Sequence, residues 1–373
     1  MKHLLLFIAC LIPLLLSGND GAFYANGNLL IPIQETDISV QKEILTIKRK
    51  NKEQVEISVY YEFFNPGKEK NIIVGFEAES PSGDVNGMPK KNGEHPFIYD
   101  FKVNMNDKDL PFNIAHVVDS LYYLNGEFQE ISLDEYTPCD NYCGFNYVYY
   151  FNTNFKKGLN IIKHTYTLEL SGSVTQKYSL TYILTAAMRW ANKQIDDFTL
   201  IIDMGESEDF YIDNTPFGDW VINGIGEEYK NQGYQTWSDN AGEFVWVETY
   251  SHFYMANGEI IFKKKNFKTK DELRLFSKQF YPSESWETFD YTVEKVLPFN
   301  SLPSFEKASD PISKKIIRNL PFAQRGYIFS APELKEYYSN QVWYFPNKEY
   351  KAKAEDLTHE EQEWIKYWSE QDQ

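Results

Sequence analysis

The sequence predicts a mainly β protein: one or two antiparallel β-sandwich subdomains followed by a small three-helix C-terminal module. Apolar and polar residues alternate in short runs from about residue 29 to 290, and the apolar spacing becomes helical after about residue 310. The hydrophobic fraction of 42% is that of a folding chain rather than a disordered one. We therefore expect a β-rich domain over 19–296, a Pro-rich linker over 297–310 and a helical module over 311–373.

The N-terminus predicts a secretory signal peptide over residues 1–18. A short basic start, Met1-Lys2-His3, precedes the apolar stretch from Leu4 to Leu16, which ends in Ser17-Gly18. This stretch is too short to be a stable membrane anchor. We expect cleavage after Gly18, with Ala22 as the alternative site, and export to the periplasm or the cell surface.

The composition also limits the partners. No later segment reaches the ~18 apolar residues of a spanning helix, so we expect no membrane span in the mature chain. The net charge of −17 argues against nucleic acid, because phosphate binding depends on clustered Lys and Arg. We expect no nucleic-acid partner and no cofactor.

Period-two runs define the β region. Apolar residues alternate from Val55 to Phe63, and the run stops at the turn signal Asn65-Pro66-Gly67. Similar runs are expected at 161–170, 198–202 and 244–247. A β region of this length is large for one sandwich, so two stacked subdomains are an alternative, with a seam near 117–155.

Two cysteines remain after the signal peptide, and we expect them to pair. Cys139 and Cys143 lie on a turn-rich segment, and in an oxidising compartment such neighbours favour a small disulfide. A redox motif has two intervening residues where this pair has three. A metal site is not supported either, because the nearest histidines, His116 and His164, show no paired spacing.

The C-terminal part contains helix-start signals. Asp310 followed by Pro311 favours a helix whose apolar face includes Ile312, Ile316, Ile317 and Leu320. Capping-box patterns at 330–333 and 358–361 predict two further helices. The prolines between 297 and 311 are typical of a semi-stiff linker.

The same region resembles the YARHG domain family, a module of exported bacterial proteins named after its Tyr-Ala-Arg-His-Gly motif. The family has no settled activity, so the resemblance implies an extracytoplasmic module and no reaction. The chain departs from the family at Gln324, Arg325, Pro321 and Trp364, and Arg325 stands where the family carries His. The matching segments are Arg318-Asn319, Phe322 to Gly326, Tyr327 to Phe329, Leu334 to Tyr338, Trp343-Tyr344, and Leu357 with Glu361 and Ile365.

The region from Asn19 to about residue 290 is similar to a family of secreted bacterial β proteins of unknown function. That resemblance implies a fold and a compartment only. It rests on Asn19-Asp20, Gly27-Asn28-Leu29, Asp37 to Val40, Glu43-Ile44-Leu45, Phe198 to Asp203, and Asn266-Phe267 before Glu272-Leu273.

The candidate ligand-binding residues form an aromatic–cation set in the helical module. Such rings and cations can recognise a sugar or a protein partner. Packing is the alternative, because a small domain needs its large side chains for a core. The set is Arg318, Arg325, Tyr327, Trp343 and Tyr344.

No catalytic or metal-binding motif is recognisable. We expect His164 to be a core histidine with one hydrogen-bond partner, since it lies on the apolar face of a strand. Ser251 and His252 should point to opposite faces of a strand, which argues against a Ser–His–Asp triad. The acidic run 205–209 lacks the alternate ligand positions of a calcium loop, so we expect a solvated loop there.

These observations favour an exported cell-envelope protein that binds or scaffolds a wall glycan or an envelope protein and is not an enzyme. The alternative is a carbohydrate-active hydrolase with a carboxylate pair in a β cleft, because acidic residues are abundant. Paired carboxylates in a deep cleft would favour the enzyme, whereas an aromatic surface without such a pair would favour binding.

Overall fold

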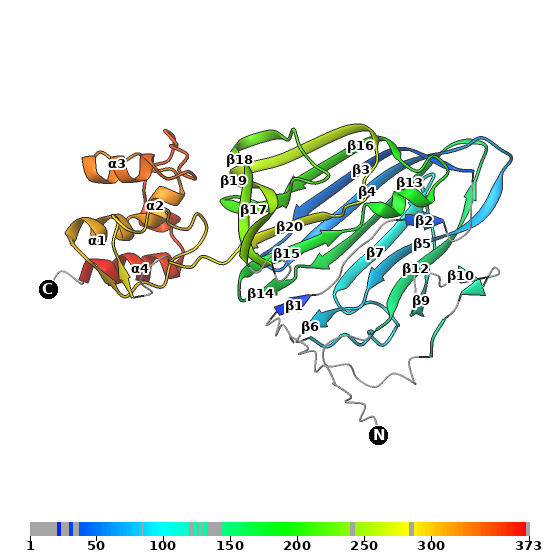
Figure 1. The fold of residues 1–373 in the computed structure, drawn as a ribbon, viewed down its shortest axis with the longest axis horizontal. Helices are drawn as coiled ribbons and strands as arrows, with labels where there is room; N and C mark the ends of the chain where they lie inside the picture. The colour runs from blue at the N-terminus through cyan, green and yellow to red at the C-terminus, as the bar shows by residue number, and fades with distance from the viewer. Residues whose placement is uncertain are drawn as a thin grey trace, which may run out of the picture.

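The structure is a computed structural model of the chain. A large β region is followed by a helical C-terminal region, which lies beside one end of the sheets (Figure 1). This confirms a mainly β fold with a short helical end. The structure describes residues 21–23, 30–32, 37–83, 85–118, 123–124, 127–128, 130–132, 144–238, 243–282 and 287–370.

An 11-stranded sheet forms the larger layer of the β region. Ten strands follow one path of neighbours, and β18 pairs with β19 off that path. In order across the sheet, the strands are β15 (Gln176–Tyr182), β20 (Leu273–Lys278), β17 (Glu208–Asp213), β19 (Glu243–Phe267), β16 (Ile195–Asp203), β3 (Ser39–Arg49), β4 (Gln54–Asn65), β13 (Gly158–Glu169), β7 (Ile98–Met105) and β8 (Lys108–Asp109), with β18 (Val221–Ser238) beside β19.

The four period-two runs of the sequence lie in β4, β13, β16 and β19, as predicted. The large sheet is mixed rather than purely antiparallel, because β3 and β16 run parallel, with Leu45 opposite Leu200. Parallel neighbours need a long connection. Here the connection includes β4, β7 and β13 of the same sheet. Alternation along a strand does not indicate the direction of its neighbour, so the sequence did not predict the parallel pair.

A four-stranded sheet packs against one face of the large sheet. Its strands in order are β2 (Leu30–Pro32), β5 (Lys70–Glu79), β12 (Asn146–Phe155) and β9 (Asn113–Val117). Aromatic rings join the two layers: the Phe76 ring lies 4.9 Å from Phe101 and 5.0 Å from Tyr166. One continuous apolar cluster fills the space between the sheets. Strand β12 lies within 117–155, where the sequence predicts a seam.

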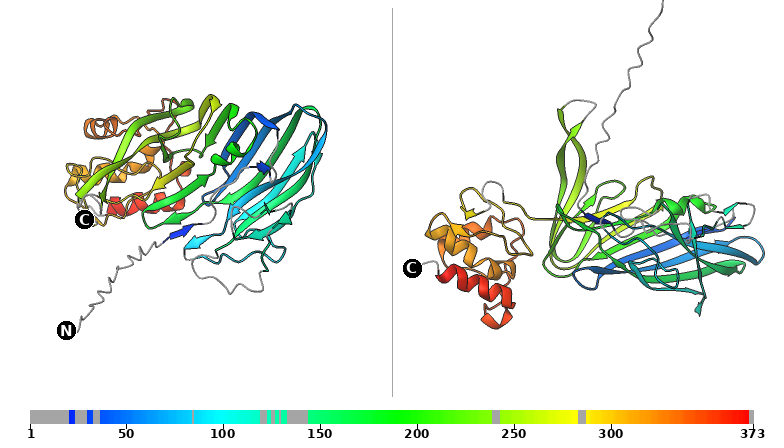
Figure 2. Two further views of the ribbon diagram at one scale, coloured as in Figure 1. Left: turned by 45° about the vertical axis from the view of Figure 1, so that its right-hand side comes forward. Right: turned by 90° about the horizontal axis from the view of Figure 1, so that it is seen from below.

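Short elements complete the β region. Figure 2 shows the hairpin of β18 and β19 rising from the end of the large sheet that lies nearest the helices. The short elements are β1 (Gly21–Phe23), β6 (Ser82–Gly83), β10 (Tyr123–Leu124), β11 (Glu127–Phe128), β14 (Gly172–Ser173), β21 (Thr288–Phe289), β22 (Lys307–Ala308) and the 3-10 helix η2 (Thr185–Arg189).

The helical region contains four α-helices, one more than the sequence predicts. They surround a second apolar cluster, to which the predicted linker contributes Leu297, Phe299 and Phe305. The same cluster includes Tyr254 of β19, so the two parts of the chain share packed side chains. The elements are α1 (Pro311–Arg318), α2 (Leu320–Gln324), α3 (Pro332–Ser339), η3 (Ala354–Asp356) and α4 (His359–Glu370).

The helix starts follow the sequence signals in two of three cases. The Asp310 side chain accepts hydrogen bonds from the N–H groups of Ile312 and Ser313, which caps α1 as predicted. Thr358 and Glu361 form the predicted capping box at α4, through reciprocal bonds of 2.7 and 3.2 Å. The box predicted at 330–333 is wrong, because α3 begins at Pro332 with Ala331 as its N-cap and no side-chain cap.

The apolar face of α1 differs from the prediction at one position. Ile316, Ile317 and Leu320 are fully buried, whereas Ile312 is 39% exposed. Ile312 therefore lies at the surface, whereas Ser313 beside it is fully buried with the two later isoleucines.

Two predictions lie outside the described residues: the signal peptide over residues 1–18 and the disulfide between Cys139 and Cys143. Within the described part of the chain, no helix combines the length and apolar character that a membrane crossing requires.

Candidate functional site

Three of the predicted ligand-binding residues are engaged in packing. Trp343 is 1% exposed, and its indole N–H donates to the Leu297 carbonyl at 2.6 Å. The Tyr344 hydroxyl donates to the Tyr327 carbonyl, also at 2.6 Å. The ring of Tyr327 lies 5.0 Å from the ring of Phe329, edge to face. These contacts place the three aromatic residues of the set around the core of the helical region.

Arg325, one of the two predicted arginines, forms an ion pair within the helical region. The Arg325 guanidinium forms two bonds to the Glu361 carboxylate, at 2.7 and 2.8 Å, and a third to the Pro321 carbonyl. Although burial acts against it, the hydrogen bond from Arg325 holds the pKa of Glu361 below its usual range. Arg318, at the end of α1, is half-buried. Ligand binding by the five residues stays a prediction.

Two other motif positions have structural roles. Gln324, where the family pattern has Arg, donates to the carbonyls of Pro298 and Ser301 at 2.9 and 3.0 Å. Gly326 adopts a φ of +76°, and a Cβ there would lie 2.2 Å from the Phe345 carbonyl oxygen. Glycine is therefore required at this point of the motif for both backbone angle and space.

A pocket of about 330 Å³ lies where the segment 296–301 crosses the end of the large sheet. Its floor comes from β15, β17, β19 and β20, and its wall from that segment, which we call the wall segment. The volume is at the lower end of the range of about 300–1,000 Å³ for small-molecule sites. The described lining residues are Lys177, Asp209, Tyr211, His252, Tyr254, Lys278, Gln279, Phe280, Tyr281, Val296, Leu297, Pro298, Phe299, Asn300 and Ser301.

Strand alternation explains why these side chains meet. On β17, Phe210 and Ile212 point into the core, which turns Asp209 and Tyr211 outward. On β19 the neighbouring positions Phe253 and Met255 are likewise buried in the core, so His252 faces the pocket. The register places Tyr211 directly opposite His252, so the two strands form one continuous floor.

The centre of the floor is a histidine held by a carboxylate and by aromatic rings. His252 Nε2 lies 3.1 Å from Asp209 Oδ2. Its ring stacks on Tyr211 with a centroid distance of 3.8 Å and lies 4.1 Å from the ring of Tyr254. These contacts fix the ring orientation of His252 and leave an aromatic surface beside it.

Two lysines give the pocket its positive side. Lys177 and Lys278 line the pocket, and both keep part of their surface exposed to solvent. Burial lowers the pKa of both lysines, and for Lys177 the charges of Glu208 and Asp209 oppose that effect. The Lys278 ammonium lies 4.4 Å from the centroid of the Tyr211 ring, in cation–π geometry.

The wall segment is attached to both parts of the protein. Asn300 donates to Glu208 at 2.9 Å, which links it to β17. Burial raises the pKa of Glu208, while Lys177 and Arg49 act in the opposite direction. On the other side, Leu297 accepts from Trp343 and donates its N–H to the Gln341 side chain at 3.1 Å. The helical region therefore holds one wall of the pocket in place.

Acidic residues are few in the described pocket lining. Asp209 is the one carboxylate among the described lining residues, so the pocket has no carboxylate pair there. Ser251 donates instead to Asn214 and Glu228, on the other face of β19 from His252, as alternation predicts. Among the described residues, no cluster of three or more His, Cys, Asp or Glu could hold a metal ion.

A second group of polar residues is enclosed between the two sheets. Glu43 is fully buried, and neither carboxylate oxygen has a hydrogen-bond partner among the described residues. Burial raises its pKa to about 8. Tyr182 lies close enough to Glu43 and Tyr61 to interact with both electrostatically.

His164 belongs to the same group. Its ring stacks on Tyr61 at 5.9 Å, and burial lowers its pKa to about 3. The predicted core position is confirmed. The expected hydrogen-bond partner is wrong for the described part of the chain, where both ring nitrogens lack one.

Sequence reasoning missed most of the pocket. From the sequence, His252 is notable only as the neighbour of Ser251, and Asp209 only as part of an acidic run. Glu208 and Asp209 in fact begin β17, so the predicted solvated loop is wrong at these two positions. Alternation was the signal that could have revealed this strand, because the polar Asp209 and the outward Tyr211 flank the buried Phe210.

The fold defines a two-part protein, a large β region carrying a helical domain whose residues hold one wall of a pocket. Residues 301–373 match the YARHG domain. The C-terminal part of this chain is therefore a YARHG domain, as the resemblance implied.

Over most of its length the chain is similar in fold to a "putative nutrient binding protein" from Legionella pneumophila. The TM-score is 0.50 with 20% sequence identity, over 94% of this chain and 99% of that protein. An M1 zinc metallopeptidase from Deinococcus radiodurans matches with a TM-score of 0.25 and 8% identity, over 62% of this chain and 43% of that one. Baculovirus P35 matches with a TM-score of 0.26 and 9% identity, over 68% of this chain and 100% of that one. These two TM-scores are too low to indicate a shared function. No curated protein matches the sequence.

Proposed function

We propose that this protein binds a carboxylated sugar in the pocket between the large sheet and the wall segment. The observation that carries the proposal is the combination of two partly desolvated lysines with an aromatic floor. A bound carboxylate offsets the cost of desolvating Lys177 and Lys278, because an anion favours their charged form.

The aromatic floor suits the ring of such a ligand. Tyr211 and Tyr254 line the pocket, and we place the apolar side of the sugar ring against their uncovered edges. Gln279 and Asn300 add amide groups for sugar hydroxyls. The Legionella protein of similar fold is described as nutrient binding, which supports a ligand-binding role for this chain.

We also propose that the protein works outside the cytoplasm as a binding protein of the bacterial envelope. Support comes from the N-terminal pattern, with Met1-Lys2-His3 before an apolar stretch, and from the YARHG domain. N-terminal sequencing of the protein exported by a bacterial host tests this proposal. We expect Asn19 as the first residue, and a retained Met1 would contradict it.

The binding proposal is tested with two pairs of sugars that differ in charge. Glucuronate is compared with glucose, and N-acetylmuramate with N-acetylglucosamine, by calorimetric titration of the full-length protein. We expect at least one acid to bind about tenfold more tightly than its neutral counterpart, with affinity falling as salt rises.

Variants locate the binding. Lys278→Gln should weaken acid binding by about tenfold, the loss of roughly one charge-assisted contact. Lys163→Gln, a lysine on β13 that is 50% exposed, serves as the matched control and should change nothing. Equal affinities for acids and neutral sugars, or unchanged acid binding in Lys278→Gln, would contradict the proposal. Turnover of a glycoside of either acid would instead favour the hydrolase alternative.

A further inference from the structure

A second pocket, of about 590 Å³, lies in the helical region between α1, α3 and residues 291–295. We call it the helical pocket. Its volume falls within the range of about 300–1,000 Å³ that is usual for small-molecule sites. Lys295 lines this pocket, whereas the next residue, Val296, lines the pocket at the large sheet. The described linings of the two pockets share no residue, so each is a separate site.

Helical periodicity explains which side chains of α3 line the helical pocket. They are Glu333, Glu336, Tyr337 and Asn340, at positions i, i+3, i+4 and i+7, which share one face of a helix. The ring of Tyr337 lies 6.4 Å from that of Tyr291, edge to face. The exposed Ile312 of α1 adds an aliphatic side chain, so three elements contribute apolar surface to the same pocket.

The helical pocket keeps one uncompensated charge of each sign. Lys295 and Glu336 are both exposed, and neither has an ion pair within the part of the chain that the structure describes. Glu333 differs, because it pairs with Lys315, whose hydrogen bond holds the pKa of Glu333 below its usual range. Glu336 lies in the last turn of α3, where the free carbonyl groups of the helix also attract a cation.

The backbone that carries the lysine is held by hydrogen bonds. The buried Gln341 donates from Nε2 to the Lys295 carbonyl at 2.7 Å and accepts at Oε1 from the Leu297 N–H at 3.1 Å. The Tyr337 hydroxyl donates to the Glu294 carbonyl at 3.2 Å. Residues 294–297 are thereby fixed beside α3. A ligand that binds groups held in this way loses less free energy to their ordering.

We propose that the helical pocket binds a small zwitterion with an apolar side chain, a free amino acid or a short peptide. Its ammonium group lies at Glu336, its carboxylate at Lys295 and its side chain against Ile312 and Tyr291. A purely anionic ligand would meet repulsion from Glu336, and a purely cationic one would meet it from Lys295. The proposal is independent of sugar binding, since it uses no residue of the other pocket.

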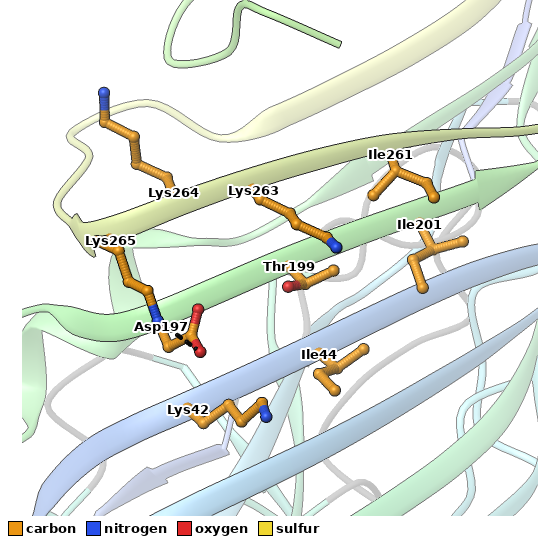
Figure 3. A pocket seen from close by; sticks show the side chains of 9 residues that line it. All are labelled: Lys42, Ile44, Asp197, Thr199, Ile201, Ile261, Lys263, Lys264 and Lys265. Carbon is orange, nitrogen blue, oxygen red and sulfur yellow. Dashed lines mark ion pairs between the residues drawn. The ribbon is translucent and has the colours of Figure 1, made fainter. Parts of the chain in front are cut away.

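A hollow on the outer face of the large sheet lacks this combination of charges (Figure 3). Ile201, Ile261 and Lys263 line it, and its carboxylate, Asp197, pairs with Lys265 at 2.8 Å. Among the described lining residues, no unpaired carboxylate is left for an ammonium group. Lys263 is therefore a matched control for Lys295: an exposed lysine near apolar side chains, without a free carboxylate beside it.

Calorimetric titration of the full-length protein with leucine and with leucyl-leucine tests the proposal and distinguishes an amino acid from a peptide. We expect at least one of the two to bind. Its N-acetyl form and its C-terminal amide should each bind at least about tenfold more weakly, because each has lost one charge-assisted contact. Glycine or glycyl-glycine, with the same charges and no apolar side chain, should also bind more weakly.

Variants assign each charge to its partner. Lys295→Gln should weaken binding of the zwitterion about tenfold and leave the affinity of the amide form unchanged, because that form has no carboxylate. Glu336→Gln should weaken the zwitterion equally and leave the N-acetyl form unchanged. Lys263→Gln should change neither. All three positions are exposed, and circular dichroism of each variant confirms that it folds.

Three results would overturn the proposal. The first is that neither leucine nor leucyl-leucine binds, or that the zwitterion and both blocked forms bind equally well. The second is zwitterion binding that neither Lys295→Gln nor Glu336→Gln weakens. The third is a loss in Lys263→Gln as large as that in Lys295→Gln, which would place the ligand elsewhere.

Discussion

At the scale of single residues, Glu43 differs most from its expected behaviour. Its carboxyl group is buried between the sheets without a hydrogen-bond partner among the described residues. Burial therefore raises its pKa from 4.5 to about 8. At neutral pH the folded protein keeps this proton, whereas the unfolded chain releases it.

This difference gives a signed prediction for stability against pH. Because the folded state binds the proton more tightly, the contribution of Glu43 is fully present below about pH 4.5. It is lost as the pH rises to about 8, at up to about 1.4 kcal/mol per pH unit. Glu43→Gln should remove this decline, which urea unfolding at pH 5 to 9 measures.

Two comparisons isolate the effect. Glu56→Gln, at an exposed position of β4, is the matched control and should keep the wild-type decline. His95 and His164 act in the opposite direction at lower pH, because burial lowers their pKa values to about 3. The test is therefore the difference between wild type and variant. A difference that stays constant from pH 5 to 9 would contradict the prediction.

The burial of Glu43 was within reach of the sequence. Leu45 and Ile47 are buried two and four positions later, so alternation places Glu43 on the same inward face. The start of the strand obscures this, since the register shifts between Val40 and Lys42 and both Val40 and Glu43 point inward. In the sequence, Glu43 stands out only as part of the Glu43-Ile44-Leu45 segment of a family resemblance.

At the scale of elements, the Arg325–Glu361 pair joins the end of α2 to the first turn of α4. Its two parallel hydrogen bonds have the bidentate geometry that a lysine cannot reproduce. Glu361 also completes the capping box with Thr358. One carboxylate thus orders both the start of α4 and its position against α2.

Removal of this arginine should destabilise the YARHG domain. Arg325→Ala leaves the partly buried Glu361 without its partner, and we expect a loss of about 1–3 kcal/mol. Lys315→Ala removes the more exposed pair with Glu333 and should cost clearly less than Arg325→Ala. Chemical denaturation followed by tryptophan fluorescence measures both. Equal losses for the two variants would contradict a special role for the Arg325–Glu361 pair.

The elements themselves were largely predictable, because strands with one buried face and helices with capping signals have distinct periods. The failure at 330–333 has a local cause. Ala331 is extended immediately before Pro332, and Glu333 turns to Lys315 rather than back to the cap. A capping pattern in sequence does not say whether a carboxylate has a better partner in the fold.

At the scale of the whole molecule, Phe299 contacts both the β region and the YARHG domain. It is 2% exposed, stacks on Trp343 at 5.7 Å and lies edge to face against Tyr254 at 6.1 Å. The Tyr229 hydroxyl adds a bond of 3.2 Å to the Val342 carbonyl. These contacts cross between the two parts of the chain.

Truncation of this ring should uncouple the two parts. We expect Phe299→Ala to cost about 3–5 kcal/mol and to split a single calorimetric transition into two. Phe329→Ala, in the interior of the YARHG domain, also removes a buried ring and should lower stability while keeping the transitions coupled. Identical melting profiles for the two variants would contradict the role of Phe299.

The pocket itself could not have been predicted from the sequence. Its residues come from four strands and the wall segment, between Lys177 and Ser301, and strand order rather than spacing brings them together. The YARHG motif was recognisable because its signal is local. Its contribution to the pocket, through Trp343 and Gln324, depends on carbonyl groups of a segment that shows no motif.

The parallel pairing of β3 with β16 has a consequence for how the chain reaches this fold. The parallel pairing forms only when residues 195–203 reach residues 39–49, and contacts between such distant segments slow folding. Until β16 arrives, the edge of β3 is open to other chains. We therefore expect the yield of refolded protein to fall as the protein concentration during refolding rises.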